Sequence, residues 1–427
     1  MTACKKFLKI FIPALCSAAF LLSVPFNSVY SQVYLQPLYP NIESAENSFH
    51  SAKPNLPAGN PVVCTDGVDK AFEKAYSECF EAASPAAAAV LIEARTGKIL
   101  FEKNSDKHLP MASTTKTMTA LIVIENCTLD EIIEIPPEAA GVEGSSMYLK
   151  KGERVSVKDL LYGLMLLSGN DAAVALAIHT AGSVPAFADM MNARAESLGL
   201  SDTHFVTPNG LHDKAHYTTA KELSLIGAEA MKNEIFREIV STDYYVSQTG
   251  ENPRTMRNKN SLLKDYPGAC GIKTGYTSAA GRCLLFSAEK DGMLLVGSVL
   301  HCRPMFEVSR IMLDFGFENF TLHKVYGAGD KIAGCLVKNG KKSILALNAK
   351  EDIIIPLRKG TKFTAETRIF LNKNVTAPVF KGEELACAEL FIDGKSVLTF
   401  PLTAGESIPS RDFLFYLKLL LRFFGRK

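Results

Sequence analysis

Residues 112–120 read Ala112-Ser113-Thr114-Thr115-Lys116-Thr117-Met118-Thr119-Ala120, and the fold can be predicted outward from this stretch. From Thr114 to Glu125 the chain is apolar nearly all round, which is typical of a helix buried inside a domain. Ser113 stands at the start of this predicted helix, so Lys116 lies one turn further along on the same face as the seryl oxygen. Free N–H groups at a helix N-terminus favour negative charge in that region. The stretch therefore predicts a serine and a lysine held side by side at the start of a buried helix.

Two further short motifs follow the first in order along the chain. Ser168-Gly169-Asn170 lies in a predicted loop between two helices, and Lys273-Thr274-Gly275 opens a predicted strand. A glycine inside a strand lets another group approach the backbone closely. Each motif is weak evidence by itself, since a Ser-x-x-Lys occurs by chance in most chains of this length. Their order and their placement on the predicted elements carry the argument.

The residue types in these motifs suit nucleophilic catalysis by a serine. A seryl hydroxyl becomes a strong nucleophile when a neighbouring base takes its proton. Lys116 is the candidate base, provided that burial and the nearby cation Lys273 keep it neutral near physiological pH. Ser168 is placed to relay a proton to a leaving amine, and Asn170 to orient Lys116 and a substrate amide. Thr274 offers a hydroxyl to a substrate carboxylate.

Such a site also needs an oxyanion hole, which consists of two backbone N–H donors aimed at the developing negative charge. The N–H groups of Ser113 and Tyr276 are the natural pair, because Tyr276 directly follows Gly275 on the predicted strand. The sequence thus assigns a complete acyl-transfer site to three separate segments.

The segments around the motifs predict one sheet with helices packed on it. Residues 87–103 form a predicted hairpin, and the strand pattern returns from Gly271 to Leu300. The patterns between them are helical, with capping boxes where Ser156 precedes Asp159 and Thr219 precedes Glu222. Strands that bracket a helical middle indicate a sheet built from both ends of an α/β (α+β) domain.

The chain changes character beyond about residue 320. Short alternating strands are separated by Asn339-Gly340, Lys359-Gly360 and Asp393-Gly394, which predicts a small all-β domain. Phe413 to Phe424 is almost wholly apolar, yet Arg411, Lys418, Arg422 and Arg426 recur at helical spacing in one stripe. Twelve residues span only ~18 Å of helix, which is too short to cross a bilayer. A helix lying in the membrane surface is expected, and a helix packed on the protein's own domain is the alternative.

The N-terminus indicates export. Lys5, Lys6 and Lys9 precede an apolar run from Ile10 to Phe26, and Val29-Tyr30-Ser31 offers small residues for signal cleavage. An uncleaved membrane anchor is the alternative, and either places the body of the protein outside the cytoplasm. The predicted organisation is a signal peptide (1–31), an N-terminal tether (32–83), the α/β domain (84–318), a β-sandwich (319–407) and an amphipathic membrane-surface helix (408–427).

Composition and scattered reactive residues exclude some functions. The formal net charge of the 427-residue chain is +2, which gives no case for a nucleic-acid partner. His204, His212 and His216 have no common metal-ligand spacing, so we expect no metal. Eight cysteines remain after the signal peptide. A bridge between Cys64 and Cys79 is possible in an exported protein, with scattered buried thiols as the alternative. Cys270 and Cys283 flank the Lys-Thr-Gly strand and are expected to pack there, with a redox or disulfide role as the alternative.

The three motifs resemble those of the penicillin-recognising serine enzymes. Their surroundings resemble the low-molecular-weight D-alanyl-D-alanine carboxypeptidases over about residues 84 to 318. The segments that carry this likeness are Ala112 to Ala120, Thr207-Pro208-Asn209-Gly210-Leu211, His216-Tyr217-Thr218-Thr219-Ala220, Tyr266-Pro267-Gly268 and Gly271-Ile272-Lys273-Thr274-Gly275-Tyr276-Thr277. A β-sandwich and a C-terminal amphipathic anchor are also features of that family, which extends the likeness to nearly the whole chain.

The resemblance implies that Ser113 is acylated by D-Ala-D-Ala peptides of peptidoglycan and by β-lactams, without a metal or organic cofactor. Family members often place a basic residue upstream of the Lys-Thr-Gly strand to hold the terminal carboxylate, and Lys259 sits near that place. A serine β-lactamase is an alternative hypothesis for the function. However, Glu196-Ser197-Leu198-Gly199-Leu200 does not match the Glu-x-x-Leu-Asn segment of class A enzymes. An endopeptidase, or a sensor that is acylated without turnover, also remains open.

Overall fold

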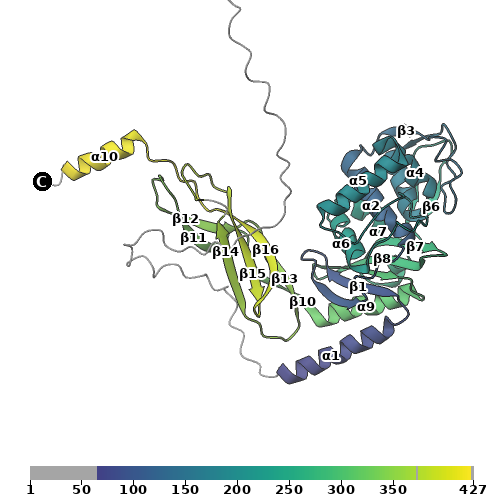
Figure 1. Ribbon diagram of the computed structural model, residues 1–427, viewed down its shortest axis with the longest axis horizontal. Helices are drawn as coiled ribbons and strands as arrows, with labels where there is room; N and C mark the ends of the chain where they lie inside the picture. The colour runs from purple at the N-terminus through teal and green to yellow at the C-terminus, as the bar shows by residue number, and fades with distance from the viewer. Residues whose placement is uncertain (1–64, 372–373, 425–427) are drawn as a thin grey trace, which may run out of the picture. The chain divides into compact units, whose positions relative to one another are not determined.

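The computed structural model describes residues 65–371 and 374–424. The expected signal peptide and residues 32–64 of the expected tether lie outside the described residues. The rest of the chain contains the expected sheet with its helices, followed by a β-rich part and a C-terminal helix (Figure 1).

Five antiparallel strands form the central sheet in the order β2-β1-β9-β8-β7. They are β1 (Ala88–Glu93), β2 (Ile99–Lys103), β7 (Ala269–Thr277), β8 (Gly281–Lys290) and β9 (Met293–Leu300). The strands come from both ends of the domain, as the sequence predicts. β1 is buried along its whole length, because its residues alternate between two apolar layers, with Val90 in one and Leu91 in the other. Both faces of the sheet are therefore covered.

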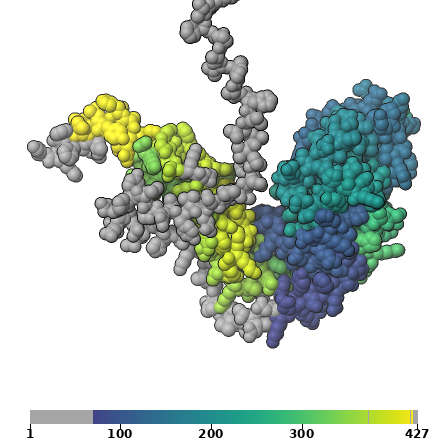
Figure 2. All heavy atoms as spheres, viewed as in Figure 1, coloured from purple at the N-terminus to yellow at the C-terminus, as the bar shows by residue number. Residues whose placement is uncertain are grey.

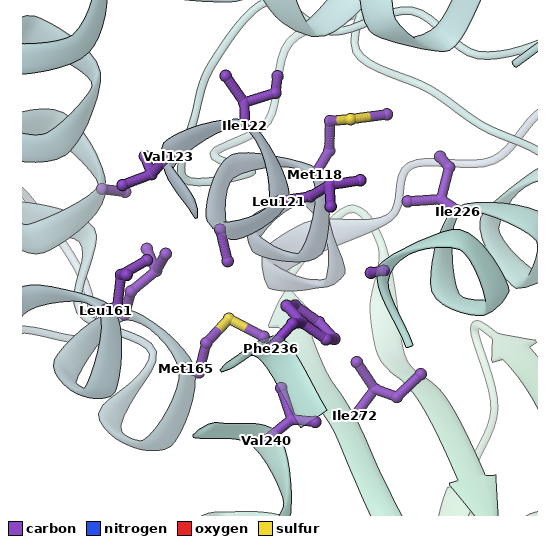
Figure 3. Packing of buried hydrophobic residues seen from close by; sticks show 14 of the residues in the cluster. Met118, Leu121, Ile122, Val123, Leu161, Met165, Ile226, Phe236, Val240 and Ile272 are labelled. Carbon is purple, nitrogen blue, oxygen red and sulfur yellow. The ribbon is translucent and has the colours of Figure 1, made fainter. Parts of the chain in front are cut away.

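The larger apolar layer surrounds the helix that follows Ser113. Figure 3 shows Met118 and Ile122 of this helix among Phe236 and Val240, which come from one other helix, and Ile272, which comes from β7. The helices on this side are the 3₁₀ turn η1 (Ala112–Thr115), α2 (Lys116–Asn126), α3 (Val157–Tyr162), the π-helix η2 (Gly163–Leu167), α4 (Asn170–Ala181), α5 (Val184–Ser197), α6 (Ala220–Ala230) and α7 (Glu234–Ser241). Two small hairpins accompany these helices, β3 (Ile132–Glu134) with β4 (Arg154–Ser156) and β5 (Tyr244–Val246) with β6 (Thr255–Arg257). The short helix α8 (Leu262–Asp265) instead contributes Leu262 to the smaller layer on the opposite face.

The opposite face of the sheet is covered by α1 (Thr65–Ala82) and α9 (Met305–Asn319). The two helices pack against each other, and Figures 1 and 2 show α1, in purple, at the lower edge of the domain. Phe72 of α1 packs on Phe315 of α9 with 5.8 Å between ring centres, and Cys79 is buried in the same layer. Residues 65–82, which the sequence analysis assigned to the tether, thus form a helix of the domain. Their apolar residues lie at helical spacing and have a sheet face to cover.

The N-cap half of each predicted capping box is present, since Ser156 Oγ accepts from the N–H of Asp159 and Thr219 Oγ1 accepts from that of Glu222. The two carboxylates bind elsewhere, that of Asp159 to the N–H of Thr249 and that of Glu222 to the N–H of Asp202. The helix that Ser156 begins changes at Gly163 to the π-helix η2, which ends at Leu167, directly before Ser168. π-Helical turns are frequent at functional sites, and this one leads directly into the second motif.

The β-rich part consists of two antiparallel sheets around one apolar core. The strands are β10 (Phe320–Tyr326), β11 (Lys331–Leu336), β12 (Ile344–Ala349), β13 (Ile353–Arg358), β14 (Ala365–Leu371), β15 (Glu384–Ile392) and β16 (Lys395–Ala404). β10 pairs with β13, and the other five pair in the order β11-β12-β16-β15-β14. Bridges from Ile408 to Val379 and from Ser410 to Gly340 carry the β-domain past its expected end at residue 407.

The C-terminal helix α10 (Phe413–Phe424) begins directly after Asp412. The carboxylate of Asp412 accepts a hydrogen bond from the N–H of Phe415. Arg411, which was expected on the basic stripe, precedes the helix and donates from Nε to the carbonyl oxygen of Gly340. The last expected stripe residue, Arg426, lies outside the described residues. Among the described residues, no single helix is long and apolar enough to cross a bilayer. One pair of these helices, α4 and α5, has the length and composition of a membrane span when taken together, but the two are bent by 83° relative to each other.

Candidate active site

Ser113 lies in a tight 3₁₀ turn directly before α2, rather than in the α-helix itself. Ala112 has a φ of 49°, in the left-handed region that residues other than glycine rarely occupy. The turn is held by the hydroxyl of Thr115, which donates to the carbonyl oxygen of Ala112 over 2.8 Å. Gly210 packs closely against the turn, since a Cβ at Gly210 would lie 2.0 Å from the carbonyl oxygen of Ala112. The strained conformation of the turn is thus fixed from two sides.

The side chain of Lys116 is fully buried and reaches back to this turn. Its Nζ lies 3.0 Å from Ser113 Oγ, 2.7 Å from Asn170 Oδ1 and 2.6 Å from the carbonyl oxygen of Asn209. Burial, together with the positive charges of Lys273 and Lys259, holds the pKa of Lys116 well below its usual value. The structure thus brings the amine of Lys116 within hydrogen-bond distance of Ser113, in surroundings that disfavour the charged form of the amine.

The two other lysines of the predicted site, Lys273 and Lys259, lie near Ser113 and Lys116. Lys273 is buried, donates to the carbonyl oxygen of Thr274 over 3.0 Å, and has a pKa lowered to about 7 by burial and by the charge of Lys259. Lys259 donates to Ser145 Oγ over 3.2 Å and to the carbonyl oxygen of Leu167 over 2.7 Å. Burial also lowers the pKa of Lys259. Lys273 is thus largely withdrawn from water, whereas Lys259 remains exposed.

The second motif joins η2 to α4. Ser168 is buried and takes a left-handed conformation with a φ of 64°, and Asn170 is the first residue of α4. The amide of Asn170 accepts from Lys116 and donates through Nδ2 to the carbonyl oxygen of Glu143 over 2.5 Å. Both ends of this amide are thus engaged, which fixes the face that it turns toward Lys116.

The third motif lies well inside β7 rather than at its start. A Cβ at Gly275 would lie 3.0 Å from the backbone nitrogen of Ser113, so only glycine lets the strand come this close. Thr274 is half-buried, and Tyr276 is exposed with the guanidinium of Arg282 5.7 Å from its ring centre. The structure thus brings the Tyr276 end of β7 beside the backbone of the nucleophile.

Sequence reasoning missed the loop that borders the site, residues 141–149. The carboxylate of Asp171, which is fully buried, accepts from the N–H groups of Met147 and Leu149 and from the hydroxyl of Ser146. Arg254 donates through Nε to the carbonyl oxygen of Met147. The signal that was available is Asp171 itself, an acidic residue that follows Asn170 in an otherwise apolar helix.

The three clustered histidines have no metal role that the structure supports. Within residues 65–371 and 374–424, no group of three His, Cys, Asp or Glu side chains is arranged to hold an ion. His216 is buried, with Nε2 2.8 Å from Thr115 Oγ1 and Nδ1 accepting from the N–H of Val206 over 3.0 Å. Because the hydroxyl of Thr115 already donates to Ala112, Nε2 must carry the proton of the neutral ring. His216 therefore supports the nucleophile turn from behind.

The cysteines that the structure describes are free thiols. Cys270 Sγ lies 3.3 Å from Ser287 Oγ, and Cys283 is buried with Sγ 3.9 Å from the carbonyl oxygen of Pro110. Burial raises the pKa of Cys283 to about 12, so it is an inert packing residue. The alternative bridge to Cys79 involves Cys64, which lies outside the described residues.

An antiparallel sheet with helices on both faces, a serine and a buried lysine at one helix, and a β-domain that follows in the chain together define a class of protein. The fold is that of penicillin-binding proteins, and the chain is a serine hydrolase. The family model for D-alanyl-D-alanine carboxypeptidases (peptidase S11) matches residues 75–303, and that for the C-terminal domain of penicillin-binding protein 5 matches residues 320–410. The chain therefore belongs to the peptidase S11 family of D-alanyl-D-alanine carboxypeptidases.

Relatives that match this chain over most of their own length support this assignment. D-alanyl-D-alanine carboxypeptidase DacF of Bacillus subtilis is 35% identical over 348 residues, which cover 79% of this chain and 90% of that protein. DacA of Escherichia coli K12 is 31% identical over 354 residues, 78% of this chain and 86% of that protein. The crystal structure of penicillin-binding protein 5 from Haemophilus influenzae superimposes with a TM-score of 0.65 at 32% identity, covering 76% of this chain and 98% of that chain. The expected carboxypeptidase function and two-domain fold are confirmed.

Proposed function

We propose that Ser113 attacks the carbonyl carbon of the bond between the last two D-alanines of a peptidoglycan stem peptide. Lys116 takes the proton of the seryl oxygen as the new C–O bond forms, and the N–H groups of Ser113 and Tyr276 bind the oxyanion. When the C–N bond breaks, the leaving amine receives a proton through Ser168. Water then hydrolyses the ester, with Lys116 again accepting a proton, and Ser113 is regenerated.

The observation that carries this proposal is the distance of 3.0 Å between Lys116 Nζ and Ser113 Oγ, at a lysine whose pKa burial has depressed. A neutral amine has one lone pair and two N–H groups. The carbonyl oxygen of Asn209 and Oδ1 of Asn170 accept the two N–H groups, since neither acceptor can donate. The lone pair is then left for the proton of Ser113, which is the arrangement of a general base.

The substrate carboxylate is bound in this proposal by the basic side chains near Ser113 and Lys116. Lys273, Thr274 and Lys259 hold the terminal carboxylate of the substrate, and Asn170 accepts or donates at the amide that precedes the scissile bond. β-Lactams acylate the same serine, because their ring amide occupies the position of the scissile peptide bond. The ester then hydrolyses slowly.

The test follows the intact mass of the protein during incubation with penicillin, with D-alanine release from a pentapeptide measured in parallel. We expect a one-to-one adduct that maps to Ser113, and release of D-alanine. Ser113→Ala loses both, whereas Ser201→Ala, at an exposed serine, retains both. Fast penicillin hydrolysis without an adduct identifies a lactamase instead, and an adduct without peptide turnover identifies a sensor.

We also propose that the protein is exported and that α10 lies in the outer surface of the cytoplasmic membrane. The apolar side chains exposed on α10 are Phe413, Leu414, Tyr416, Leu417, Leu420 and Leu421. An exposed apolar face next to the basic residue Lys418 suits a helix that lies at the boundary between anionic headgroups and acyl chains.

Sedimentation with anionic phospholipid vesicles tests the proposed anchoring. We expect the protein to sediment with the vesicles and Leu420→Asp/Leu421→Asp to remain in the supernatant. Leu336→Asp, at an equally exposed leucine on β11, is the control and should still bind. Equal binding by all three proteins would exclude α10 as the anchor.

A further inference from the structure

Tyr148 has the most unusual combination of conformation and exposure near the site. Its φ is 60°, and its side chain is 84% exposed. A bulky aromatic residue in the left-handed region is strained, and such strain persists only where the surroundings impose it. An exposed ring contributes little packing that would offset this strain. The conformation therefore calls for a reason outside the stability of the fold.

The backbone on both sides of Tyr148 is fixed by buried charges. The carboxylate of Asp171 binds the N–H groups of Met147 and Leu149, and Ser146 Oγ accepts from the N–H of Tyr148 itself over 2.8 Å. Arg254 donates to the carbonyl oxygen of Met147, and its guanidinium forms two bonds of 2.7 Å with the carboxylate of Glu153. The backbone of the loop is thus held by several hydrogen bonds, and the ring of Tyr148 is exposed to solvent.

The same loop contacts the proposed catalytic residues. The N–H of Asn170 donates to the carbonyl oxygen of Ser145 over 2.7 Å, and Nδ2 of Asn170 donates to that of Glu143. Lys259 donates to Ser145 Oγ. Asp171, which fixes the loop, is the neighbour of Asn170 in the chain. Tyr148 therefore lies on the Ser-Gly-Asn side of the site, where the amide on the acyl side of the substrate is held.

We infer that Tyr148 is a substrate-binding residue whose ring lies against the stem peptide on the N-terminal side of the D-Ala-D-Ala unit. This inference rests on the proposed function. The stem must leave the cleft beyond Asn170, and an aromatic face is suited to the aliphatic parts of its side chains. Because the backbone that carries the ring is already fixed, binding has only the side-chain torsions of Tyr148 to order, which lowers the entropic cost and gives the strained backbone a use.

Tyr148→Gly tests the inference, because glycine adopts a positive φ without strain and removes only the ring. We expect kcat/KM for a pentapeptide stem to fall about tenfold, mostly through KM, as is typical for loss of one aromatic contact. For N-acetyl-D-Ala-D-Ala, which has no stem beyond the reacting unit, the change should stay below about twofold. Acylation by 6-aminopenicillanic acid, which lacks an acyl side chain, should likewise be unchanged. Tyr148→Phe should resemble the wild type.

The thermal midpoint separates binding from folding. Tyr148→Gly should melt no lower than the wild type, since the substitution relieves strain. An equal loss on both peptides, or no loss on the pentapeptide, would overturn the inference while Ser113 is still acylated by penicillin. If the wild type neither releases D-alanine nor forms the penicillin adduct, the proposed function fails, and the role of Tyr148 fails with it.

Discussion

Lys116 Nζ lies 3.0 Å from Ser113 Oγ and 2.7 Å from Oδ1 of Asn170, so one nitrogen links the nucleophile to the second motif. The neutral charge of Asn170 matters as much as its geometry. A carboxylate at this position would attract a proton to Lys116, because an opposite charge within hydrogen-bond distance favours the ammonium form. The amide orients the base without protonating it.

Asn170→Asp should therefore slow acylation of Ser113 at neutral pH by roughly 10²–10³-fold, the scale of a lost general base. The rate should recover as pH rises, since the raised pKa of Lys116 is then exceeded. The measurement is the second-order rate of penicillin acylation between about pH 6 and 10. Asn192→Asp, at an asparagine outside the site, should leave the profile unchanged. A uniform loss at every pH would mean that Asn170 acts only by holding the loop through Glu143.

We expect Lys273 to determine the alkaline limb of the pH dependence of kcat/KM. Its pKa is about 7, so the side chain loses its charge as pH rises through neutrality. If its cation holds the substrate carboxylate, kcat/KM for the pentapeptide falls on the alkaline side. Lys273→Arg should move this limb to higher pH, because a guanidinium stays protonated. Lys290→Arg, at an exposed lysine, serves as the control. An alkaline limb that does not move would assign it to another group.

Much of this site could be predicted from the sequence because its signals are local. The spacing of Ser113 and Lys116 is one helical turn, and the pattern that predicts an N-cap at Ser156 spans only four residues, Ser156 to Asp159. The partners that complete the geometry are remote. The carbonyl oxygen of Asn209 is 93 residues from Lys116, and no periodicity in the sequence encodes that contact.

The same limit explains the errors at the ends of the domains. Helix α1 belongs to the catalytic domain because α9 and the sheet leave an apolar face that Phe72 covers, and such a face exists only after folding. Arg411 fits the basic stripe by spacing, yet Gly340 holds it before the helix starts. The strain at Ala112 and Tyr148 was also beyond prediction, since neither residue type favours a positive φ.

Gly210→Ala should uncouple the nucleophile turn from the loop that supports it. A Cβ there would lie 2.0 Å from the carbonyl oxygen of Ala112, at a φ of +82°. Gly182 is the matched control, with a φ of +80° and nothing within 4 Å of its Cβ position. Gly182→Ala should lose about 1 kcal/mol of unfolding free energy and keep its activity. Gly210→Ala should lose more, together with most penicillin acylation. Equal losses in both variants would mean that only the φ matters.

His216 should make the stability of the protein depend on pH. Burial lowers its pKa from 6.5 to about 4, so the folded state keeps the ring neutral where the unfolded state binds a proton. Stability is then constant above pH 6.5, declines as pH falls toward 4 and levels off below that. The difference of about 2.5 pKa units corresponds to about 3 kcal/mol, at 1.36 kcal/mol per unit.

Urea unfolding of the wild type and of His216→Gln between about pH 4 and 8 measures this contribution. Glutamine can donate to Thr115 Oγ1 and accept from Val206, but it does not titrate. The stability advantage of the wild type should therefore be largest above pH 6.5 and shrink as pH falls. Carboxylates such as Glu153 and Glu229, whose pKa values are lowered in the fold, titrate in both proteins and cancel in the difference. A difference that is constant with pH would show that His216 is protonated in the folded state as readily as in the unfolded chain.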